Sequence, residues 1–234
     1  MNAVIDIGNT KIKVGLFASQ GIKSISILNL EEVIPFLSLN KVQNALVSNV
    51  ALNCGFLKKL NKTIANVNEL TIETSLPVFT SYTTPKTLGV DRLAACVAAR
   101  NYTKGNVLVI DAGSCITYDL LTVENNHLGG LISPGIKMRL KAMHTLTSNL
   151  PLASFEKPQL IGTSTTKCLQ SGATNGTLAE MKGLIKQFQD EFQNLSIIIG
   201  GGDAVFFDKN LELNTFVVPN LAVEGLYTIF KYNE

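Results

Sequence analysis

Two short segments place an aspartate, a glycine and a hydroxyl group directly after an apolar run. The first is Asp6-Ile7-Gly8-Asn9-Thr10 and the second is Asp111-Ala112-Gly113-Ser114. Glycine lets the backbone turn sharply and lets a phosphate approach its amide groups. A carboxylate repels a phosphate, so each aspartate would act by holding a cation that bridges to the phosphates. One copy alone would indicate a structural turn, whereas two copies favour nucleotide binding.

Three further groups suit either a binding site or a structural role. Gly200-Gly201-Gly202 follows a run of branched residues. It could expose flat backbone to a purine or form a flexible strand-to-helix connection, and the two interpretations are equally supported. Asp91 could cap a helix or act as a general base, and its residue type alone favours the cap. Arg92 could orient an anionic or polar substrate, or pair with a structural carboxylate.

The remaining reactive side chains favour packing roles. Cys96 and Cys115 lie in apolar strings and are expected in the core, while Tyr82 could pack a core or line a pocket. The two histidines, His127 and His144, are isolated from cysteines and from each other, which disfavours a zinc site. We expect His144 to be an exposed or packing residue. The cysteines lack a CxxC pair and are expected to be reduced and mostly buried; they are Cys54, Cys96, Cys115 and Cys168.

The composition excludes several classes of protein. The chain has 234 residues, of which 46% are hydrophobic and 16% charged, so it can bury a sizeable core in one large or two small domains. The formal net charge is +2 without a dense basic cluster, and no apolar run reaches the roughly 18 residues of a membrane span. We therefore expect neither nucleic acid nor membrane as a partner. The first residues lack the basic region with which a signal peptide begins, so we expect no signal peptide and a cytoplasmic protein.

The first half of the chain predicts mainly strands. Residues 3–5 and 11–17, around a Gly-Asn turn, indicate a β-hairpin in which Ile12, Val14 and Leu16 alternate with polar or small residues. The further elements expected here are strands at 22–27 and 44–49 and a helix near 54–61.

The second half predicts alternating helices and strands. Leu93, Cys96, Val97 and Arg100 recur at helical spacing, and residues 107–110 form a continuous apolar run that is typical of a buried strand. Gly129-Gly130 and Ser133-Pro134-Gly135 indicate turns. The other elements expected are helices near 136–147, 165–175 and 178–192, a strand at 195–199, and a strand, turn and closing helix over 217–226.

The Asp-x-Gly motif is an internal repeat. Its copies lie 105 residues apart, close to half the chain and well beyond a solenoid period of roughly 20–50 residues. The pattern predicts two duplicated α/β domains, residues 1–104 and 105–234, joined near Lys104–Gly105 with a cleft between them. Since the chain has neither a Walker A sequence nor a complete GxGxxG, a P-loop or Rossmann fold is disfavoured.

Together, these motifs resemble the type III pantothenate kinases. Asp6–Thr10 resembles the first phosphate motif of that family, and Asp111–Thr117 resembles the second. Tyr82, followed seven residues later by Gly89-Val90-Asp91-Arg92, resembles the pantothenate motif. The remaining matching signatures are Gly129-Gly130-x-Ile132-x-Pro134-Gly135, Thr166 six residues before Gly172, and the glycines at 200–202.

The resemblance implies a fold and an activity. The fold is that of the acetate and sugar kinase and actin-like ATPase superfamily, which agrees with the duplicated halves. The activity is transfer of the γ-phosphate of ATP to pantothenate, giving 4′-phosphopantothenate in the first step of coenzyme A synthesis. The resemblance further implies a cytoplasmic homodimer. It also implies a need for Mg²⁺ or another divalent cation and for a monovalent cation, K⁺ or NH₄⁺.

The resemblance also implies site residues. Asp91 would be the catalytic proton acceptor, and with this context we prefer that role, although Asp91 could cap a helix as well. Asp111 would bind the monovalent cation, and Asp6 would face the divalent metal, through water. The residues implied for ATP are Asp6, Gly8, Asn9, Thr10, Lys11, Lys13 and Ser114. Those implied for pantothenate are Tyr82, Gly89, Val90, Asp91, Arg92 and Thr166.

One departure and two alternatives accompany the resemblance. The family usually has Thr-Ala where Ser114-Cys115 stands; serine keeps the hydroxyl, and Cys115 adds an oxidation-sensitive atom. A nucleotide-binding transcriptional accessory factor of the Bvg accessory factor type is the main alternative function, but the presence of both Asp91 and Arg92 favours the enzyme. A sugar or acetate kinase of the same superfamily is the other, although such chains are usually longer.

Overall fold

The structure is a computed structural model that describes residues 1–50 and 55–234. The chain divides into two compact units. Unit 1 comprises residues 1–104, 121–129 and 220–234, and unit 2 comprises residues 105–120 and 130–219. Each unit is built around one β-sheet.

The sheet of unit 1 places the first apolar run at its centre. The strand order is β3-β2-β1-β4-β5; β1 pairs antiparallel with β2 and parallel with β4. Ala3, Val4 and Ile5 of β1 are fully buried, as expected for a strand covered on both faces. The predicted hairpin and the strands at 22–27 and 44–49 are confirmed. The strands are β1 (Asn2–Ile7), β2 (Ile12–Ala18), β3 (Gly21–Leu28), β4 (Asn44–Asn49) and β5 (Asn66–Glu69).

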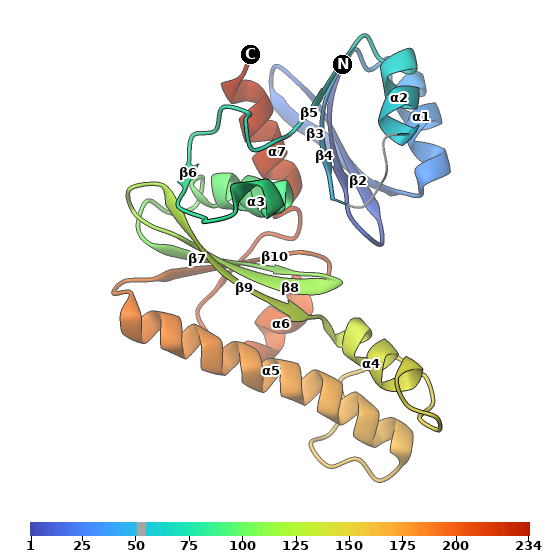
Figure 1. Cartoon of the computed structure of the whole chain (residues 1–234), viewed down its shortest axis with the longest axis vertical. Helices are drawn as coiled ribbons and strands as arrows, with labels where there is room; N and C mark the ends of the chain where they lie inside the picture. Colours follow the sequence, from blue (N-terminus) through green and yellow to red (C-terminus); the bar gives the residue numbers. More distant parts are fainter. Residues whose placement is uncertain (51–54) are drawn as a thin grey trace. The chain divides into compact units, whose positions relative to one another are not determined.

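Helices cover both faces of this sheet (Figure 1). The alternating Ile12, Val14 and Leu16 share a core with Val33 and Leu37, so they face α1 and α2. Helices α3 and α7 pack together and contact β4 and β1 respectively. Cys54, at the start of the expected helix near 54–61, lies outside the described residues. The helices are α1 (Leu30–Leu39), α2 (Gly55–Thr63), the 3₁₀ helix η1 (Pro85–Thr87), α3 (Val90–Ala99) and α7 (Leu221–Tyr232).

The closing helix α7 belongs to unit 1, which differs from the expected domain of residues 105–234. Helix α7 crosses α3 at Gly225, where a Cβ atom would lie 1.8 Å from the carbonyl oxygen of Ala94. The ring of Phe17 on β2 makes edge contacts with Tyr227 and Phe230, at centroid distances of 4.9 and 4.8 Å. These contacts link residues far apart in the sequence, which the internal repeat could not predict.

Unit 2 repeats the topology of unit 1. Its sheet has the order β11-β10-β7-β8-β9-β6, so β9-β8-β7-β10-β11 matches β3-β2-β1-β4-β5 strand for strand. The predicted duplicated α/β fold is therefore confirmed. The short β6 (Phe79–Thr80) pairs with Asn126 and His127 of β9, and all four residues belong to unit 1. The other strands are β7 (Val107–Ala112), β8 (Cys115–Leu121), β9 (Asn126–Pro134), β10 (Ser196–Gly200) and β11 (Phe216–Val217).

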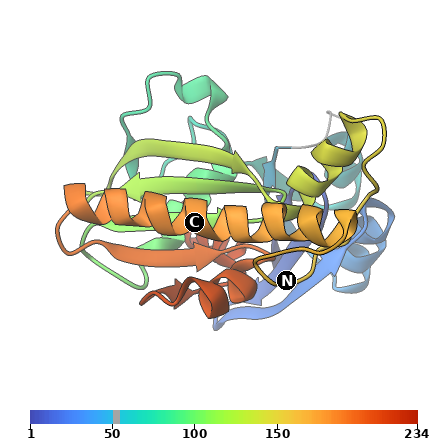
Figure 2. The same cartoon turned by 90° about the horizontal axis from the view of Figure 1, so that it is seen from below.

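One long helix replaces the two predicted over 165–192. Helix α5 (Thr165–Glu191) runs unbroken across the sheet of unit 2 (Figure 2). Its buried residues Ala173, Thr177, Met181 and Ile185 recur every fourth position, and this continuous apolar face outweighs the roughly 1 kcal/mol cost of Gly176 inside a helix. The other helices of unit 2 are α4 (Ile136–Thr145) and α6 (Ala204–Leu211).

The predicted turn at Gly129-Gly130 is wrong, because both glycines lie inside β9. A Cβ atom on Gly130 would lie 1.7 Å from the carbonyl oxygen of Tyr118, so the glycine allows two strands to approach. Gly129 has a φ of +106°, which other residues rarely adopt. None of the helices in residues 1–50 and 55–234 combines the length and hydropathy that crossing a membrane requires.

Candidate functional site

The first Asp-x-Gly segment forms the tight connection of the β1–β2 hairpin. The Gly8 N–H donates to the carbonyl oxygen of Lys11 at 3.2 Å, and this closes the turn. Asn9 and Thr10 at its tip are exposed, as is Lys11. A turn that offers exposed backbone amides, a hydroxyl and an ammonium group suits a phosphate.

Asp6 lies at the base of this turn with a basic and a hydroxyl neighbour. It stands directly opposite Lys13 on β2 and in register with Ser48 on β4. Side chains at paired positions share a face of the sheet. Ser48 is fully buried, and its Oγ has no hydrogen-bond partner among the described residues. An unsatisfied buried hydroxyl is costly, and Ser48 stands in register with the Asp6 carboxylate.

The pantothenate-like motif forms the start of α3. Gly89 occupies the N-cap position and Asp91 is the second residue of the helix, so Asp91 is not the N-cap residue itself. The Asp91 Oδ1 instead accepts a hydrogen bond from the N–H of Arg92 at 2.9 Å. A Cβ atom on Gly89 would lie 2.5 Å from that same oxygen, so the glycine makes room for the carboxylate. The positive end of the helix stabilises the ionised form that a proton acceptor needs.

Arg92 connects this helix to Tyr82. The arginine is only 7% exposed, and its guanidinium carbon lies 5.7 Å from the centroid of the Tyr82 ring. This distance is within the range of a cation–π contact. Tyr82 itself is half-buried. Unit 1 thus brings together a carboxylate, a guanidinium and a phenol ring, which suits a small anionic substrate with hydroxyl groups.

The second Asp-x-Gly segment turns from β7 into β8 in unit 2. The Gly113 N–H donates to the carbonyl oxygen of Cys115 at 2.9 Å, and the Gly135 N–H donates to that of Ser114 at 3.0 Å. A Cβ atom on Gly135 would lie 2.3 Å from the carbonyl oxygen of Gly113. The Ser133-Pro134-Gly135 segment therefore packs directly on the turn that carries Ser114.

The glycine run after β10 packs against the same turn. Gly201 has a φ of +92°, and a Cβ atom there would lie 2.5 Å from Asp111 Oδ1 and 2.3 Å from the carbonyl oxygen of Ala112. The N–H of Asp203 donates to that carbonyl oxygen at 3.0 Å. Gly201 is thus packed against the Asp111 turn.

The sequence did not single out two charged residues of this region. Burial raises the pKa of the Asp203 carboxyl above its ordinary value, and the charge of Lys137 in the first turn of α4 lowers it in part. Both follow glycines that were recognised, Asp203 after Gly202 and Lys137 two residues after Gly135. Their position after these glycines was the available signal.

Thr166, the remaining candidate for pantothenate, lies in unit 2. Thr166 is exposed in the first turn of α5, where Ser164 caps the helix by accepting from the Lys167 N–H at 3.3 Å. Tyr82 and Asp91 belong to unit 1, whereas Thr166 belongs to unit 2.

The cysteines and His144 follow their expected roles in part. Cys96 is buried, as predicted, while Cys115 is half-buried and Cys168 is exposed. The exposed His144 lies on α4 with its Nδ1 2.7 Å from the carbonyl oxygen of Leu150.

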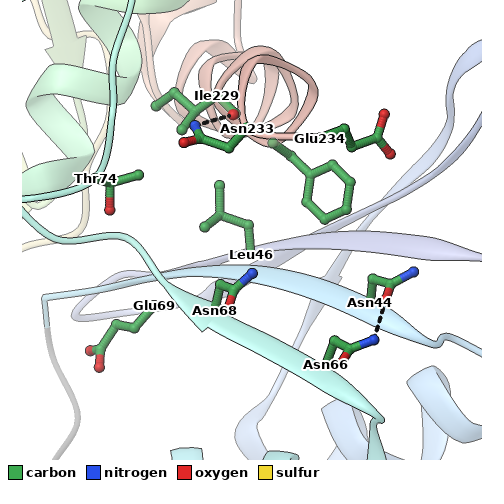
Figure 3. Close-up of a pocket in the computed structure, with 10 residues that line it drawn as sticks. Asn44, Leu46, Asn66, Asn68, Glu69, Thr74, Ile229, Asn233 and Glu234 are labelled. Carbon is green, nitrogen blue, oxygen red and sulfur yellow. Dashed lines mark hydrogen bonds between the residues drawn. The ribbon is translucent and has the colours of Figure 1, made fainter.

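A cavity of about 670 Å³ in unit 1 does not suit phosphate (Figure 3). It lies beside the starts of β4 and β5, whereas Asp6 lies near the end of β1. Glu69 and Glu234 contribute carboxylates, and none of the described residues that line it is basic, so a phosphate would be repelled. Its other lining residues are Asn44, Leu46, Asn66, Asn68, Thr74, Ile229, Phe230 and Asn233.

Comparison with known proteins identifies the family. The family model of type III pantothenate kinase matches residues 3–187. A type III pantothenate kinase from Christiangramia forsetii is 39% identical over 241 residues, covering 100% of this chain and 99% of that protein. Among solved structures, a conserved Baf family protein from Campylobacter jejuni, described as a candidate transcriptional activator, is 24% identical with a TM-score of 0.66, covering 99% of this chain and 98% of that one.

A second solved structure has a similar fold. The inorganic polyphosphate/ATP-glucomannokinase of Arthrobacter sp. strain KM has a TM-score of 0.50 at 16% identity, with full coverage of both chains. At these identities the two structures show the fold alone, which is that of the sugar kinases and actin-like ATPases. The duplicated topology, the ordered motifs and the full-length similarity agree, and the chain belongs to the type III pantothenate kinase family.

Proposed function

We propose that this protein transfers the γ-phosphate of ATP to the primary hydroxyl of pantothenate, forming 4′-phosphopantothenate in the first step of coenzyme A synthesis. The observation that carries the proposal is the start of α3, where Gly89 makes room for the Asp91 carboxylate beside the buried Arg92. The duplicated Asp-x-Gly turns supply phosphate-binding segments, as nucleotide-binding kinases of this fold require.

Asp91 is proposed as the proton acceptor. A primary alcohol is a poor nucleophile at neutral pH, so a positioned carboxylate assists by accepting its proton. Phosphoryl transfer also depends on alignment of the hydroxyl with the phosphate. Asp91 lies at the first turn of a helix whose next residue, Arg92, can attract the pantothenate carboxylate. We assign Tyr82, Gly89, Val90 and Thr166 to the pantothenate pocket as well.

Asp6 is proposed to face a divalent cation, Mg²⁺ or a similar ion. In the described part of the chain, no three His, Cys, Asp or Glu side chains group as metal ligands. This fits an ion bound mainly by phosphate oxygens and water with one protein carboxylate. When bound, the ion would neutralise charge on the phosphates. Asp6 would hold its water ligands, and the segment Gly8–Lys13 would hold the ATP phosphates.

Asp111 is proposed to bind a monovalent cation, K⁺ or NH₄⁺, with Ser114 contacting ATP. The close approach of Gly201 to the Asp111 carboxylate brings backbone to the same place, and carbonyl oxygens are suitable ligands for such ions. If so, activity rises when potassium replaces sodium, and Asp111→Asn flattens that response while Asp208→Asn, on α6, leaves it intact. Equal activity of the native protein in both salts would count against this role.

A coupled ADP-release assay tests the function. ADP should form only when pantothenate is present, and mass spectrometry should find 4′-phosphopantothenate in equal amount. A protein that binds ATP but releases no ADP with pantothenate would instead support the accessory-factor alternative. The presence of Asp91 and Arg92 favours the enzyme.

We also propose a cytoplasmic homodimer without nucleic-acid or membrane partners, on the basis of the family. Sedimentation at micromolar concentration should find about twice the 25.3 kDa mass of one chain. A single species of one-chain mass would contradict the dimer without affecting the catalytic assignment.

A further inference from the structure

We propose that His127 is a positioning residue for pantothenate, which sets the orientation of the Tyr82 ring by packing against it. The inference rests on the proposed function, because it takes Tyr82 and Arg92 as part of the pantothenate pocket. His127 is fully buried in unit 1 and lies 45 residues from Tyr82 in the sequence. None of the proposed catalytic steps uses it.

Thr80 joins the histidine to the backbone of Tyr82. The Thr80 Oγ1 lies 2.9 Å from Nδ1 of His127 and accepts a hydrogen bond from the N–H of Tyr82 at 3.1 Å. One hydroxyl thus contacts both residues. The parallel pairing of β6 with β9 holds this arrangement, because Thr80 and His127 are direct partners and the Ser81 N–H donates to the His127 carbonyl oxygen at 3.0 Å.

The two rings also stack. Their centroids are 6.2 Å apart and their planes are inclined by 23°. Gly129 is adjacent, and a Cβ atom there would lie 3.3 Å from Cδ2 of Tyr82, so the glycine leaves space for the tyrosine ring. The ring is therefore fixed by a hydrogen-bonded backbone, a stacked neighbour and a close glycine.

Arg92 is also packed against the tyrosine ring, with its guanidinium carbon 5.7 Å from the Tyr82 centroid. His127 thus contacts Tyr82, and Tyr82 contacts Arg92, which follows Asp91 in the sequence. If His127 is removed, Tyr82 can tilt into the space left behind and Arg92 loses a fixed surface. The expected consequence is weaker binding of pantothenate, with less effect on the chemical step once the substrate is bound.

The first test observes His127 directly in the unaltered protein. The chain has only two histidines, so labelled imidazole groups give two NMR signal sets, and His144→Ala assigns them. Pantothenate added with a non-hydrolysable ATP analogue should shift the His127 signals and leave those of His144 in place. The shift should disappear in Tyr82→Ala. Unmoved His127 signals in a native protein that phosphorylates pantothenate would overturn the inference alone, whereas a native protein without pantothenate turnover would overturn the proposed function and the inference together.

The second test separates positioning from general stability. His127→Ala should raise the KM for pantothenate by about threefold to tenfold, the size of an aromatic contact, and change kcat by less than about twofold. His127→Phe retains a stacking ring and should recover part of that loss, while His144→Ala should behave as wild type. A His127→Ala protein with unchanged KM, or with a loss in kcat alone, would contradict the positioning role. Thr80→Val supplies the same test without altering the histidine.

Discussion

Replacing Gly201 by alanine is expected to destabilise unit 2 and to disturb the site around Asp111. The added Cβ would lie 2.3 Å from the carbonyl oxygen of Ala112 and 2.5 Å from Asp111 Oδ1. Backbone cannot yield as easily as the end of a flexible side chain, so overpacking of this kind costs about 1–3 kcal/mol. The φ of +92° adds about 1–2 kcal/mol for a residue with a side chain.

Together these terms predict a loss of about 2–5 kcal/mol in the free energy of unfolding. For a chain of this length, that corresponds to a fall in Tm of about 4–20 °C. Gly202→Ala is the matched control: in the described part of the chain, no atom beyond its chain neighbours lies within 4 Å of where its Cβ would be, and its φ is not positive. Thermal unfolding of both variants, followed by circular dichroism, makes the comparison. Equal Tm values for the two variants would refute the packed arrangement of the glycine run on the Asp111 turn.

Two further predictions concern charged groups of unit 2. Burial raises the pKa of the Asp203 carboxyl, so its ionised form opposes folding. Asp203→Asn should therefore raise Tm at pH 8, and the gain should be smaller at about pH 4, because the native carboxyl takes up a proton more readily than the unfolded one as the pH falls. A gain that is equal at both pH values would contradict this cause. Arg139 holds the Ser133–Gly135 segment, with its Nε 2.8 Å from the Pro134 carbonyl oxygen and an Nη2 2.5 Å from Glu180. Arg139→Met should cost about 1–3 kcal/mol and raise the KM for ATP. Arg139→Lys should recover only part of this loss, because lysine cannot donate from two separate nitrogens, and full recovery would contradict this explanation.

Much of the fold could be predicted from local pattern. The alternation of Ile12, Val14 and Leu16 and the buried run Val107–Ile110 indicated strands, and both are strands. The repeat of Asp6 at Asp111 predicted duplicated halves. In the structure, each aspartate lies near the end of a central strand of its sheet. These features are encoded within a few residues, so a single sequence is enough to reveal them.

The errors arise where tertiary packing outweighs local preference. Two helices were predicted near 165–175 and 178–192, but the buried face of α5 continues through the residues between them. Gly129 and Gly130 suggested a turn, although their lack of side chains serves close strand packing. The position of α7 in unit 1 depends on Gly225 meeting Ala94, a contact between residues 131 positions apart.

The candidate site was predictable as a set of motifs rather than as a set of contacts. Tyr82, Gly89 and Asp91 were recognised from their spacing, but the packing of His127 against Tyr82 has no local sequence signal. Likewise, Ser48 comes into register with Asp6 only through the pairing of β4 with β1. Residues that support a site from another strand are found only when the sheet order is known.

The catalytic role of Asp91 is tested most directly by turnover of Asp91→Asn at saturating ATP and pantothenate, with product identified by mass spectrometry. Asparagine preserves the size of the side chain and can still accept from the Arg92 N–H, so the fold, the Tm and ATP binding should persist. Loss of the proton acceptor should lower kcat by at least about tenfold, a modest value beside the roughly 10²–10⁴ typical of general-base catalysis. A variant with native stability that forms 4′-phosphopantothenate at the wild-type rate would contradict the account.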